Sequence, residues 1–236
     1  MRRFALYGVR RSGNHAVMEW LLKNCSGTDA RHVIKHSMVF SNNSCYLNDI
    51  TGPGAITAQL RIDHMFASST FQNIIVSYED KPTGYITEFS LGYQKIVILR
   101  DIRNVAASRY KKSLDQSGRA SWTNLMRMDE EFFKCWLDHA YANTKGKILA
   151  IKFEDWVSSK NYRDETAKKL ALKNIDSIKT VSHHGEGSSF SIGNQDPPSP
   201  EELKDRWKQI ELPEVTKRRI NSDDIQKARA HLGYSD

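Results

Sequence analysis

Four short runs of mostly apolar residues are the feature that most constrains how this chain can fold. They cover residues 4–9, 73–78, 95–99 and 147–153, and the last three are rich in β-branched side chains. A strand that is apolar on both sides must be covered on both faces of its sheet, as the central strands of a parallel sheet are. The runs therefore predict the strands of such a sheet.

Patterns typical of helices fill the stretches between these strands. In the first one, Val17 and Leu21 lie four residues apart, a spacing that places them on one face of a helix. Strands that alternate with helices are typical of the α/β class. We predict a three-layer α/β sandwich with a central parallel sheet, formed by a single domain over residues 1–236. The predicted helices cover residues 14–23, 103–114, 129–144 and 162–173.

Three other stretches carry weaker patterns. Residues 40–70 contain scattered Asn, Ser, Gly and Pro, so we expect irregular structure with short helical pieces there. Residues 182–200 are rich in Gly, Ser, His and Pro and predict a long surface loop. From Pro200 to about Gly233 we expect short helices that Trp207 anchors to the rest of the domain.

The charge balance and the cysteines narrow the surroundings in which the chain works. Lys and Arg exceed Asp and Glu by 35 − 28 = +7, which favours anionic ligands. Cys25, Cys45 and Cys135 form no Cys-x-x-Cys pair and are odd in number, so a reducing compartment is expected. The apolar stretch after Met1 is too short for a signal peptide or a membrane span. We expect a cytoplasmic protein.

The turn after the first strand has the glycine spacing of a phosphate-binding P-loop. It spans Gly8 to Gly13 and leads into a predicted helix, whose N-terminal N–H groups can bind anionic oxygens. In a nucleoside triphosphatase, Lys and then Ser or Thr would follow, and the hydroxyl would hold magnesium. Here Asn14 and His15 follow, which disfavours metal-assisted phosphoryl transfer.

The same loop resembles the phosphosulfate-binding loop of the PAPS-dependent sulfotransferases, in which a strand leads into Lys-Ser-Gly-Thr-Thr-Trp. The resemblance implies that Arg11 replaces the lysine that contacts the leaving phosphate and the sulfuryl group, where a fixed cation stabilises developing charge. Ala16 stands where the family commonly has a Trp that stacks on adenine. Further donors to the same oxygens would come from Ser12, Gly13, Asn14 and His15.

A second element resembles the signature with which these sulfotransferases bind the 3′-phosphate of PAPS. Arg100 follows the strand at 95–99, and Ser108 lies eight residues later in a predicted helix. The resemblance implies that both hold this phosphate, which Arg can bind through two donors. Taken singly, Arg100 could instead pair with Asp101 or Asp155, and Ser108 could face solvent.

A third element supplies a candidate base. After the strand at 73–78 the chain reads Glu79-Asp80-Lys81-Pro82-Thr83, similar to the Glu-Lys-Ser/Thr-Pro stretch of carbohydrate sulfotransferases. In that family the Glu is the catalytic base, which takes the acceptor's proton. Glu79 is the expected base, with Asp80 as the alternative because the register differs by one residue. His36 and His64 stay open, since other sulfotransferases use a His.

Two weaker resemblances complete the pattern. Residues 190–193 stand where small-molecule sulfotransferases have Phe-Arg-Lys-Gly, but this chain has no cations there, and His183 or His184 could contribute instead. Residues 151–155 resemble the Tyr-Glu-Asp stretch of a late strand, in which we expect Glu154 to be structural.

Together these resemblances predict sulfuryl transfer from PAPS, with PAP as product, to a hydroxyl or amine of a small-molecule or carbohydrate acceptor. We expect no metal, because the pairs His32/His36 and His183/His184 come without further zinc ligands. The sequence contains no stripe of basic residues interleaved with aromatic ones, so we do not expect nucleic-acid binding. A P-loop nucleotide kinase and a non-catalytic nucleotide-binding protein are the alternatives. The sequence predicts neither the acceptor nor the oligomeric state.

Overall fold

The computed structural model describes residues 2–26, 32–34, 38–41, 44–48, 73–85, 92–115, 127–145, 147–173 and 199–234. Within this part, one sheet contains seven strands in the order β2-β3-β4-β5-β1-β6-β7. The strands are β1 (Arg2–Gly8), β2 (His32–Ile34), β3 (Met38–Ser41), β4 (Ser44–Asn48), β5 (Asn73–Glu79), β6 (Gln94–Leu99) and β7 (Leu149–Lys152).

The centre of the sheet is parallel, as predicted. Strand β1 lies between β5 and β6, and it runs parallel to both. Strands β4 and β7 extend the parallel part on either side. Beyond β4, the strands β3 and β2 are antiparallel, so the whole sheet is mixed.

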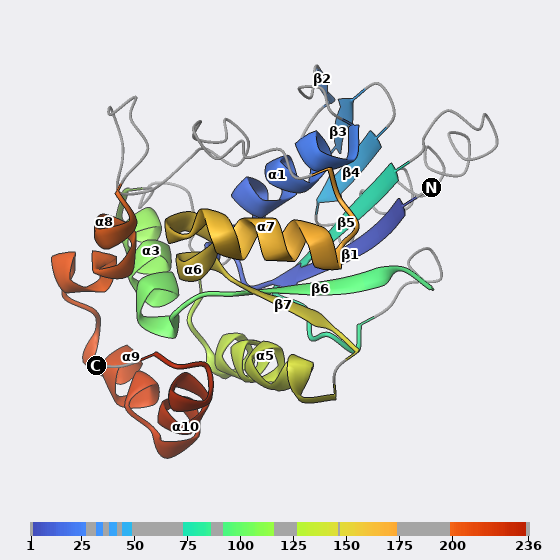
Figure 1. Ribbon diagram of the computed structural model, residues 1–236. Coiled ribbons are helices and arrows are strands. Elements are labelled where there is room, and N and C mark those ends of the chain that lie inside the picture. The colour runs from blue at the N-terminus through green and yellow to red at the C-terminus, as the bar shows by residue number, and fades with distance from the viewer. Residues whose placement is uncertain are drawn as a thin grey trace.

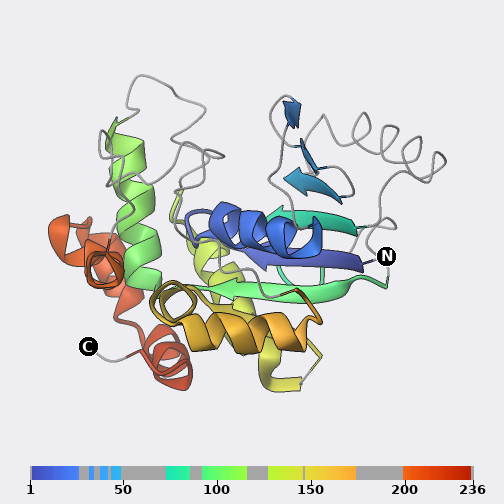
Figure 2. The same cartoon turned by 45° about the horizontal axis from the view of Figure 1, so that its top comes forward.

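Helices cover both faces of the sheet, which gives the three layers (Figures 1 and 2). One face is covered by α1, α6 and α7, and the other by α5 and the 3₁₀ turn η2. The helices are α1 (Asn14–Ser26), α3 (Ile102–Asp115), α5 (Glu130–Tyr141), η2 (Ala142–Lys145), α6 (Phe153–Ser158), α7 (Lys160–Lys169), α8 (Pro200–Lys204), η3 (Arg206–Gln209), α9 (Glu214–Ile220) and α10 (Asp223–His231). The α/β class and the three-layer architecture are therefore confirmed.

Strand β1 shows why the sheet needs both layers. Phe4 and Leu6 pack with α1, α6 and α7 on one face, while Ala5 and Tyr7 pack on the other. All four side chains are almost completely buried. A strand that is apolar on both sides gains stability only if both faces are removed from water.

Two parts of the sequence-based assignment were wrong. Residues 40–41 and 44–48 were expected to be irregular, but they form the end of β3 and the whole of β4. The expected strand at 147–153 is shorter, because β7 ends at Lys152 and Phe153 begins α6. An apolar residue fits a strand or the buried side of a helix equally well, so periodicity alone missed this boundary. The remaining residues of 40–70 and the loop at 182–198 lie outside the described residues.

The C-terminal part forms the expected short helices, which pack beside α3 and α5 (Figure 1). Trp207 donates its backbone N–H to Asn104 Oδ1 at 3.1 Å, and the Arg103 guanidinium lies 4.3 Å from the Trp207 ring centre. Leu212 and Ile225 are more deeply buried, in the cluster that also contains Phe133 of α5. Trp207 is therefore one of several anchors.

No helix in the described ranges has both the length and the apolar character that crossing a membrane requires. Among the residues whose structure is described, Cys25 and Cys135 are free thiols.

The loop between β1 and α1 depends on Gly13. Its φ is +97°, and a Cβ at this position would lie 2.2 Å from the Phe153 ring. We expect Gly13→Ala to lower the free energy of unfolding by about 2 to 5 kcal/mol, because a strained φ and a steric clash add. Urea denaturation measures this change.

Gly84→Ala is the matched control, since a Cβ there meets no atom within 4 Å. We expect this variant to unfold like the wild type. A Gly13→Ala protein as stable as Gly84→Ala would contradict the packing described for the loop.

Candidate functional site

Polar residues gather where the central strands end. Strand β1 ends at Gly8, which pairs with Glu79, the last residue of β5. Strand β6 ends at Leu99, and Arg100 follows it. The carboxyl ends of parallel strands are where α/β sheets bind ligands. This edge of the sheet therefore brings the loop after β1 together with the candidate base and the candidate phosphate-binding arginine.

The backbone of the loop is tightly folded. Ser12 N–H donates to Val9 O at 3.1 Å, and Val17 N–H donates to Gly13 O at 3.2 Å as α1 begins. Arg11 has a φ of +74°, an uncommon conformation for a residue with a side chain. A Cβ at Gly8 would lie 2.1 Å from Asn14 Oδ1, so only glycine fits there.

Asn14 connects this loop to the candidate base. It is 3% exposed, and its Nδ2 donates to Glu79 Oε1 at 3.0 Å. Its Oδ1 accepts a 2.7 Å hydrogen bond from Ser12 Oγ. Asn14 therefore binds both Ser12 and Glu79, while His15 lies partly exposed on the first turn of α1.

Two arginines hold the two neighbouring carboxylates. Arg10 Nε donates to Glu79 Oε2 at 3.3 Å and lies 3.7 Å from Asp80 Oδ2. Asp80 has a φ of +54° and accepts a 2.9 Å hydrogen bond from the Arg10 N–H. The Arg109 guanidinium, which is 2% exposed, also binds Asp80 Oδ1. Glu79 faces the loop, whereas Asp80 ties the loop to α3.

Both residues of the expected 3′-phosphate site, Arg100 and Ser108, contact Arg11. Arg11 Nε donates to Ser108 Oγ at 3.2 Å, and Arg100 Nη1 donates to Arg11 O at 2.9 Å. Arg100 and Ser108 are 4% and 2% exposed. The structure thus places Arg11 on the side of Ser108, while its neighbour Arg10 points to Glu79.

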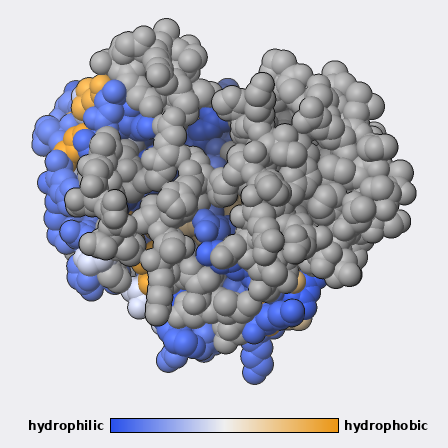
Figure 3. Space-filling view, turned by 90° about the horizontal axis from the view of Figure 1, so that it is seen from above, coloured by the Kyte–Doolittle hydropathy of each residue, from blue (hydrophilic) through white to orange (hydrophobic). Residues whose placement is uncertain are grey.

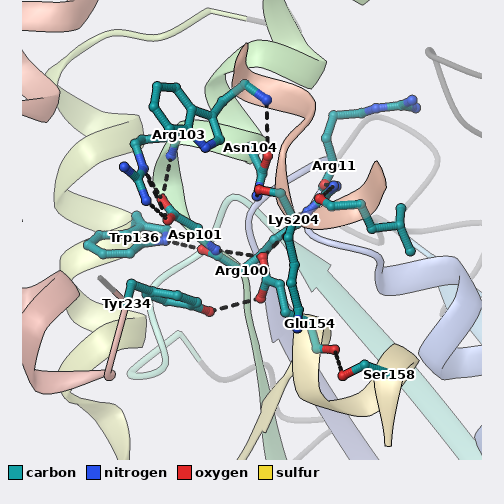
Figure 4. A network of polar contacts seen from close by, with 12 residues as sticks. Arg11, Arg100, Asp101, Arg103, Asn104, Trp136, Glu154, Ser158, Lys204 and Tyr234 are labelled. Carbon is teal, nitrogen blue, oxygen red and sulfur yellow. Dashed lines mark hydrogen bonds and ion pairs between the residues drawn. The ribbon is translucent and has the colours of Figure 1, made fainter. Parts of the chain in front are cut away.

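Arg100 also contacts two other elements, α8 and α6 (Figure 4). Its Nη2 donates to Leu203 O at 3.5 Å, and its Nε lies 3.9 Å from Glu154 Oε1. Its guanidinium lies 5.2 Å from the centre of the Phe153 ring. Burial lowers the pKa of Arg100, and the nearby Glu154 carboxylate opposes this shift. The ion-pair partner is therefore Glu154, not Asp101 or Asp155.

Glu154 has the structural role expected of it. It accepts hydrogen bonds from Asp101 N–H at 3.1 Å and from Tyr234 Oη at 3.0 Å (Figure 4). Burial raises the pKa of Glu154, and Arg100 acts in the opposite direction. Asp101 in turn binds Arg103 at 2.8 Å and Arg229 at 3.5 Å. This network fixes the start of α3 and the end of the described chain around Arg100.

A further arginine belongs to the same cluster. Arg206, at the start of η3, is 4% exposed. Burial lowers the pKa of Arg206 to about 10, and the positive charges of Arg100 and Arg11 contribute to this shift. Arg206 therefore lies where the charges of Arg100 and Arg11 act on it.

The structure does not describe every residue expected at the site. His36, His64, His183, His184 and residues 190–193 lie outside the described ranges, and so does the side chain of His32. Among the side chains that the structure describes, no three His, Cys, Asp or Glu residues are grouped closely enough to hold a metal ion. Seen from above, the described surface is mainly hydrophilic, with hydrophobic side chains only in small patches (Figure 3).

Sequence reasoning missed Arg10, Arg109 and Arg206. Arg10 and Arg109 each stand next to a residue that was singled out, Arg11 and Ser108. Adjacent side chains in a tight turn or in a helix point in different directions. Arg10 and Arg109 could therefore have been expected to contact other groups than Arg11 and Ser108 do. Arg206 carried no such signal, because its proximity depends on how the C-terminal helices pack.

Neither protein-family models nor curated proteins match this sequence. Solved structures do resemble it. The sulfotransferase domain from the curacin biosynthetic pathway has a TM-score of 0.55 at 12% identity, and the similarity covers 99% of this chain and 98% of that domain. The sulfotransferase domain of the Synechococcus PCC 7002 olefin synthase has a TM-score of 0.51 at 11% identity, over 100% and 96% of the two chains.

Mouse sulfotransferase SULT7A1 in complex with PAP has a TM-score of 0.47 at 14% identity, over 100% of this chain and 90% of that one. Since that score is below 0.5, the fold assignment depends on the other two structures. This chain has the α/β fold of the sulfotransferases, as the sequence resemblance implied. At such low sequence identity, the comparison with these structures identifies the fold alone.

The raised pKa of Glu154 has a measurable consequence. Its folded-state pKa lies above the ordinary value of 4.5, so the folded protein holds this proton to a higher pH than the unfolded chain does. This group therefore makes the free energy of unfolding fall as the pH rises from about 4.5 through the folded-state pKa. We expect Glu154→Gln to lose less stability than the wild type between pH 4.5 and 7.

Urea denaturation at several pH values measures that slope. Glu165→Gln is the control, because it makes the same change at an exposed position on α7. Equal slopes for the wild type and Glu154→Gln would contradict the burial of this carboxylate.

Proposed function

We propose that this chain is a PAPS-dependent sulfotransferase with one catalytic domain over residues 1–236. It would transfer a sulfuryl group to a hydroxyl or amine of a small-molecule or carbohydrate acceptor. The observation that carries the proposal is the contact of Arg11 with Ser108 and of Arg100 with the Arg11 carbonyl, beside a P-loop-like turn. The shared fold with two sulfotransferase domains supports it.

The residues present fit a donor that is anionic at two places. Arg100 and Ser108 would hold the 3′-phosphate, the first through guanidinium donors and the second through its hydroxyl. Arg11 and the turn formed by Ser12, Gly13, Asn14 and His15 would surround the reacting end. Fixed donors that point to developing negative charge stabilise it without reorganisation. PAPS would supply the sulfuryl group, and PAP would leave.

Glu79 is the proposed base. In the transfer, the bond from sulfur to the phosphate oxygen breaks, a bond from sulfur to the acceptor atom forms, and the acceptor's proton goes to the carboxylate. Asn14 and Arg10 each occupy one lone pair on a different oxygen of Glu79. A carboxylate oxygen has two, so each oxygen can still accept a proton. Asp80, held by Arg10 and Arg109, would position the loop.

Binding of three nucleotides to the wild-type protein tests the proposal. We expect PAP to raise the melting temperature most, because only PAP carries the phosphate that Arg100 and Ser108 would bind. At a ligand concentration 100 times Kd the gain is about 2.7 kcal/mol, or roughly 5 to 10 °C for a chain of this length. Thermal-shift measurements with PAP, ADP and ATP with magnesium give the comparison.

The other outcomes identify the alternatives. ATP with magnesium stabilising the protein better than PAP would favour a nucleotide kinase. Tight PAP binding without a sulfated product, across a panel of hydroxyl and amine compounds, would favour a non-catalytic nucleotide-binding protein. We expect sulfuryl transfer to continue in EDTA, since Asn14 and His15 stand where a magnesium-binding loop would have Lys and Ser or Thr.

Glu79→Gln tests the base. We expect its turnover to fall by about 10² to 10⁴-fold, because the proton acceptor is lost, while PAP affinity stays within about threefold. Asp80→Asn, which changes the adjacent carboxylate in the same way, is the matched control. PAP release from PAPS, with an acceptor found in the panel, measures turnover. A larger loss in Asp80→Asn than in Glu79→Gln would reassign the base.

A further inference from the structure

Consecutive residues of α3 contact consecutive residues of the turn after β1. Arg11 Nε donates to Ser108 Oγ at 3.2 Å, and Arg109 Nε donates to Arg10 O at 3.3 Å. Because neighbouring side chains of a helix point in different directions, these two contacts hold the turn at two separate places. Helix α3 therefore fixes the position of Arg10 as well as that of Arg11.

The guanidinium of Arg109 uses each of its three nitrogens for a different part of the chain. Nε donates to Arg10 O, Nη1 donates to Arg127 O at 2.7 Å, and Nη2 binds Asp80 Oδ1. The group also lies 4.3 Å from the centre of the Phe132 ring, and the residue is 2% exposed. Donors that diverge from one rigid plane are a property of arginine, which lysine does not share.

Asp80 binds the other side of the same peptide backbone. Its Oδ1 accepts a 2.9 Å hydrogen bond from the Arg10 N–H, and its own N–H donates to Gly8 O at 3.2 Å. Asp80 has a φ of +54°, a conformation that persists only where the surroundings hold it. The ion pair of Asp80 and Arg109 thus binds both the N–H and the carbonyl of Arg10.

The side chain of Arg10 extends from this fixed backbone to the proposed base. Its Nε donates to Glu79 Oε2 at 3.3 Å, while Asn14 Nδ2 donates to Glu79 Oε1 at 3.0 Å. Both oxygens of the carboxylate are therefore held, and their directions depend on where Arg10 and Asn14 lie. A misplacement of about 1 Å at reacting groups lowers rates steeply. The backbone position of Arg10 thus matters for the base.

We propose that Arg109 is a positioning residue for the proposed base. Together with Asp80 it fixes the backbone of Arg10, whose side chain then orients the Glu79 carboxylate. This inference rests on the proposed function. In this role Arg109 acts through Arg10 and contacts no reacting atom. Its loss should slow sulfuryl transfer and leave donor binding nearly unchanged.

Arg109→Lys tests this role, since it keeps the charge but offers one nitrogen in place of three. We expect the kcat for PAP release from PAPS to fall about 10-fold, because the base is displaced from its best position. The KM for PAPS and the Kd for PAP should stay within about threefold. Rate measurements with an acceptor found in the panel and calorimetric titration with PAP give these values.

The same substitution in a Glu79→Gln background separates positioning from a structural role. If Arg109 acts through the base, Arg109→Lys should slow Glu79→Gln by less than about threefold, because the group that it positions has already been removed. A residue that only supports the fold would slow both backgrounds by the same factor. Equal factors in the two backgrounds would therefore overturn the proposal.

Arg163→Lys is the matched control. Arg163 is 5% exposed on α7, and its Nη1 donates to Trp156 O at 2.7 Å and to Val157 O at 3.0 Å. It is thus another buried arginine that binds backbone carbonyls, apart from the residues proposed for the reaction. We expect it to keep the kcat of the wild type. An equal loss of kcat in this variant would assign the effect of Arg109→Lys to lost stability and sink the inference.

Asp80→Asn tests the same ion pair if Arg109→Lys does not fold, because the Asp80 side chain is 25% exposed. It should also lower kcat about 10-fold, and by less than about threefold in the Glu79→Gln background.

The outcomes distinguish this inference from the proposed function. Wild-type rates in Arg109→Lys or Asp80→Asn, with Glu79→Gln slow, would overturn the inference and leave the proposed function standing. A wild-type protein that does not prefer PAP to ADP and releases no PAP from PAPS would contradict the proposed function, and the inference with it.

Discussion

The buried guanidinium of Arg100 is the group on which the arrangement of the site depends. It stands at the end of β6 and contacts the loop after β1, the end of α8 and Glu154 at the start of α6. These elements come from distant parts of the chain, and each offers either a carbonyl or a carboxylate to the same cation. Because a buried charge must be paired or hydrogen-bonded, its burial obliges these elements to assemble around it.

The contacts around Arg100 also explain why Glu154 and Tyr234 contribute to the fold more than to the proposed reaction. Glu154 offsets the charge of Arg100 on the side away from Arg11, and Tyr234 binds its second oxygen. Trp136 donates to the Arg100 carbonyl at 2.9 Å, so α5 also contributes to holding this residue. A rigid surround of this kind fixes where donors point, which is what anion binding and charge stabilisation require.

The sequence predicted the central sheet and the helices on its faces, because these depend on local patterns and on the ends of strands. It missed β4, whose residues have weak periodicity and gain their strand conformation from pairing with β5. It also missed Arg109 and Arg206, since one is distinguished only by the direction of its side chain and the other by the packing of the C-terminal helices. The sequence also could not predict that Arg10 pairs with Glu79. This contact depends on the backbone conformation of the turn, in which Arg11 takes a positive φ.

That turn has a consequence for how the chain can vary. Two consecutive arginines diverge from it, Arg10 toward Glu79 and Arg11 toward Ser108. A single residue inserted between Gly8 and Gly13 would rotate both side chains away from their partners and force a bulkier residue against Asn14 or Phe153. The length of this turn is therefore constrained twice, by sterics at its glycines and by the opposite orientations of its two cations. Homologues that preserve the site should differ in the identity of these residues before they differ in their number.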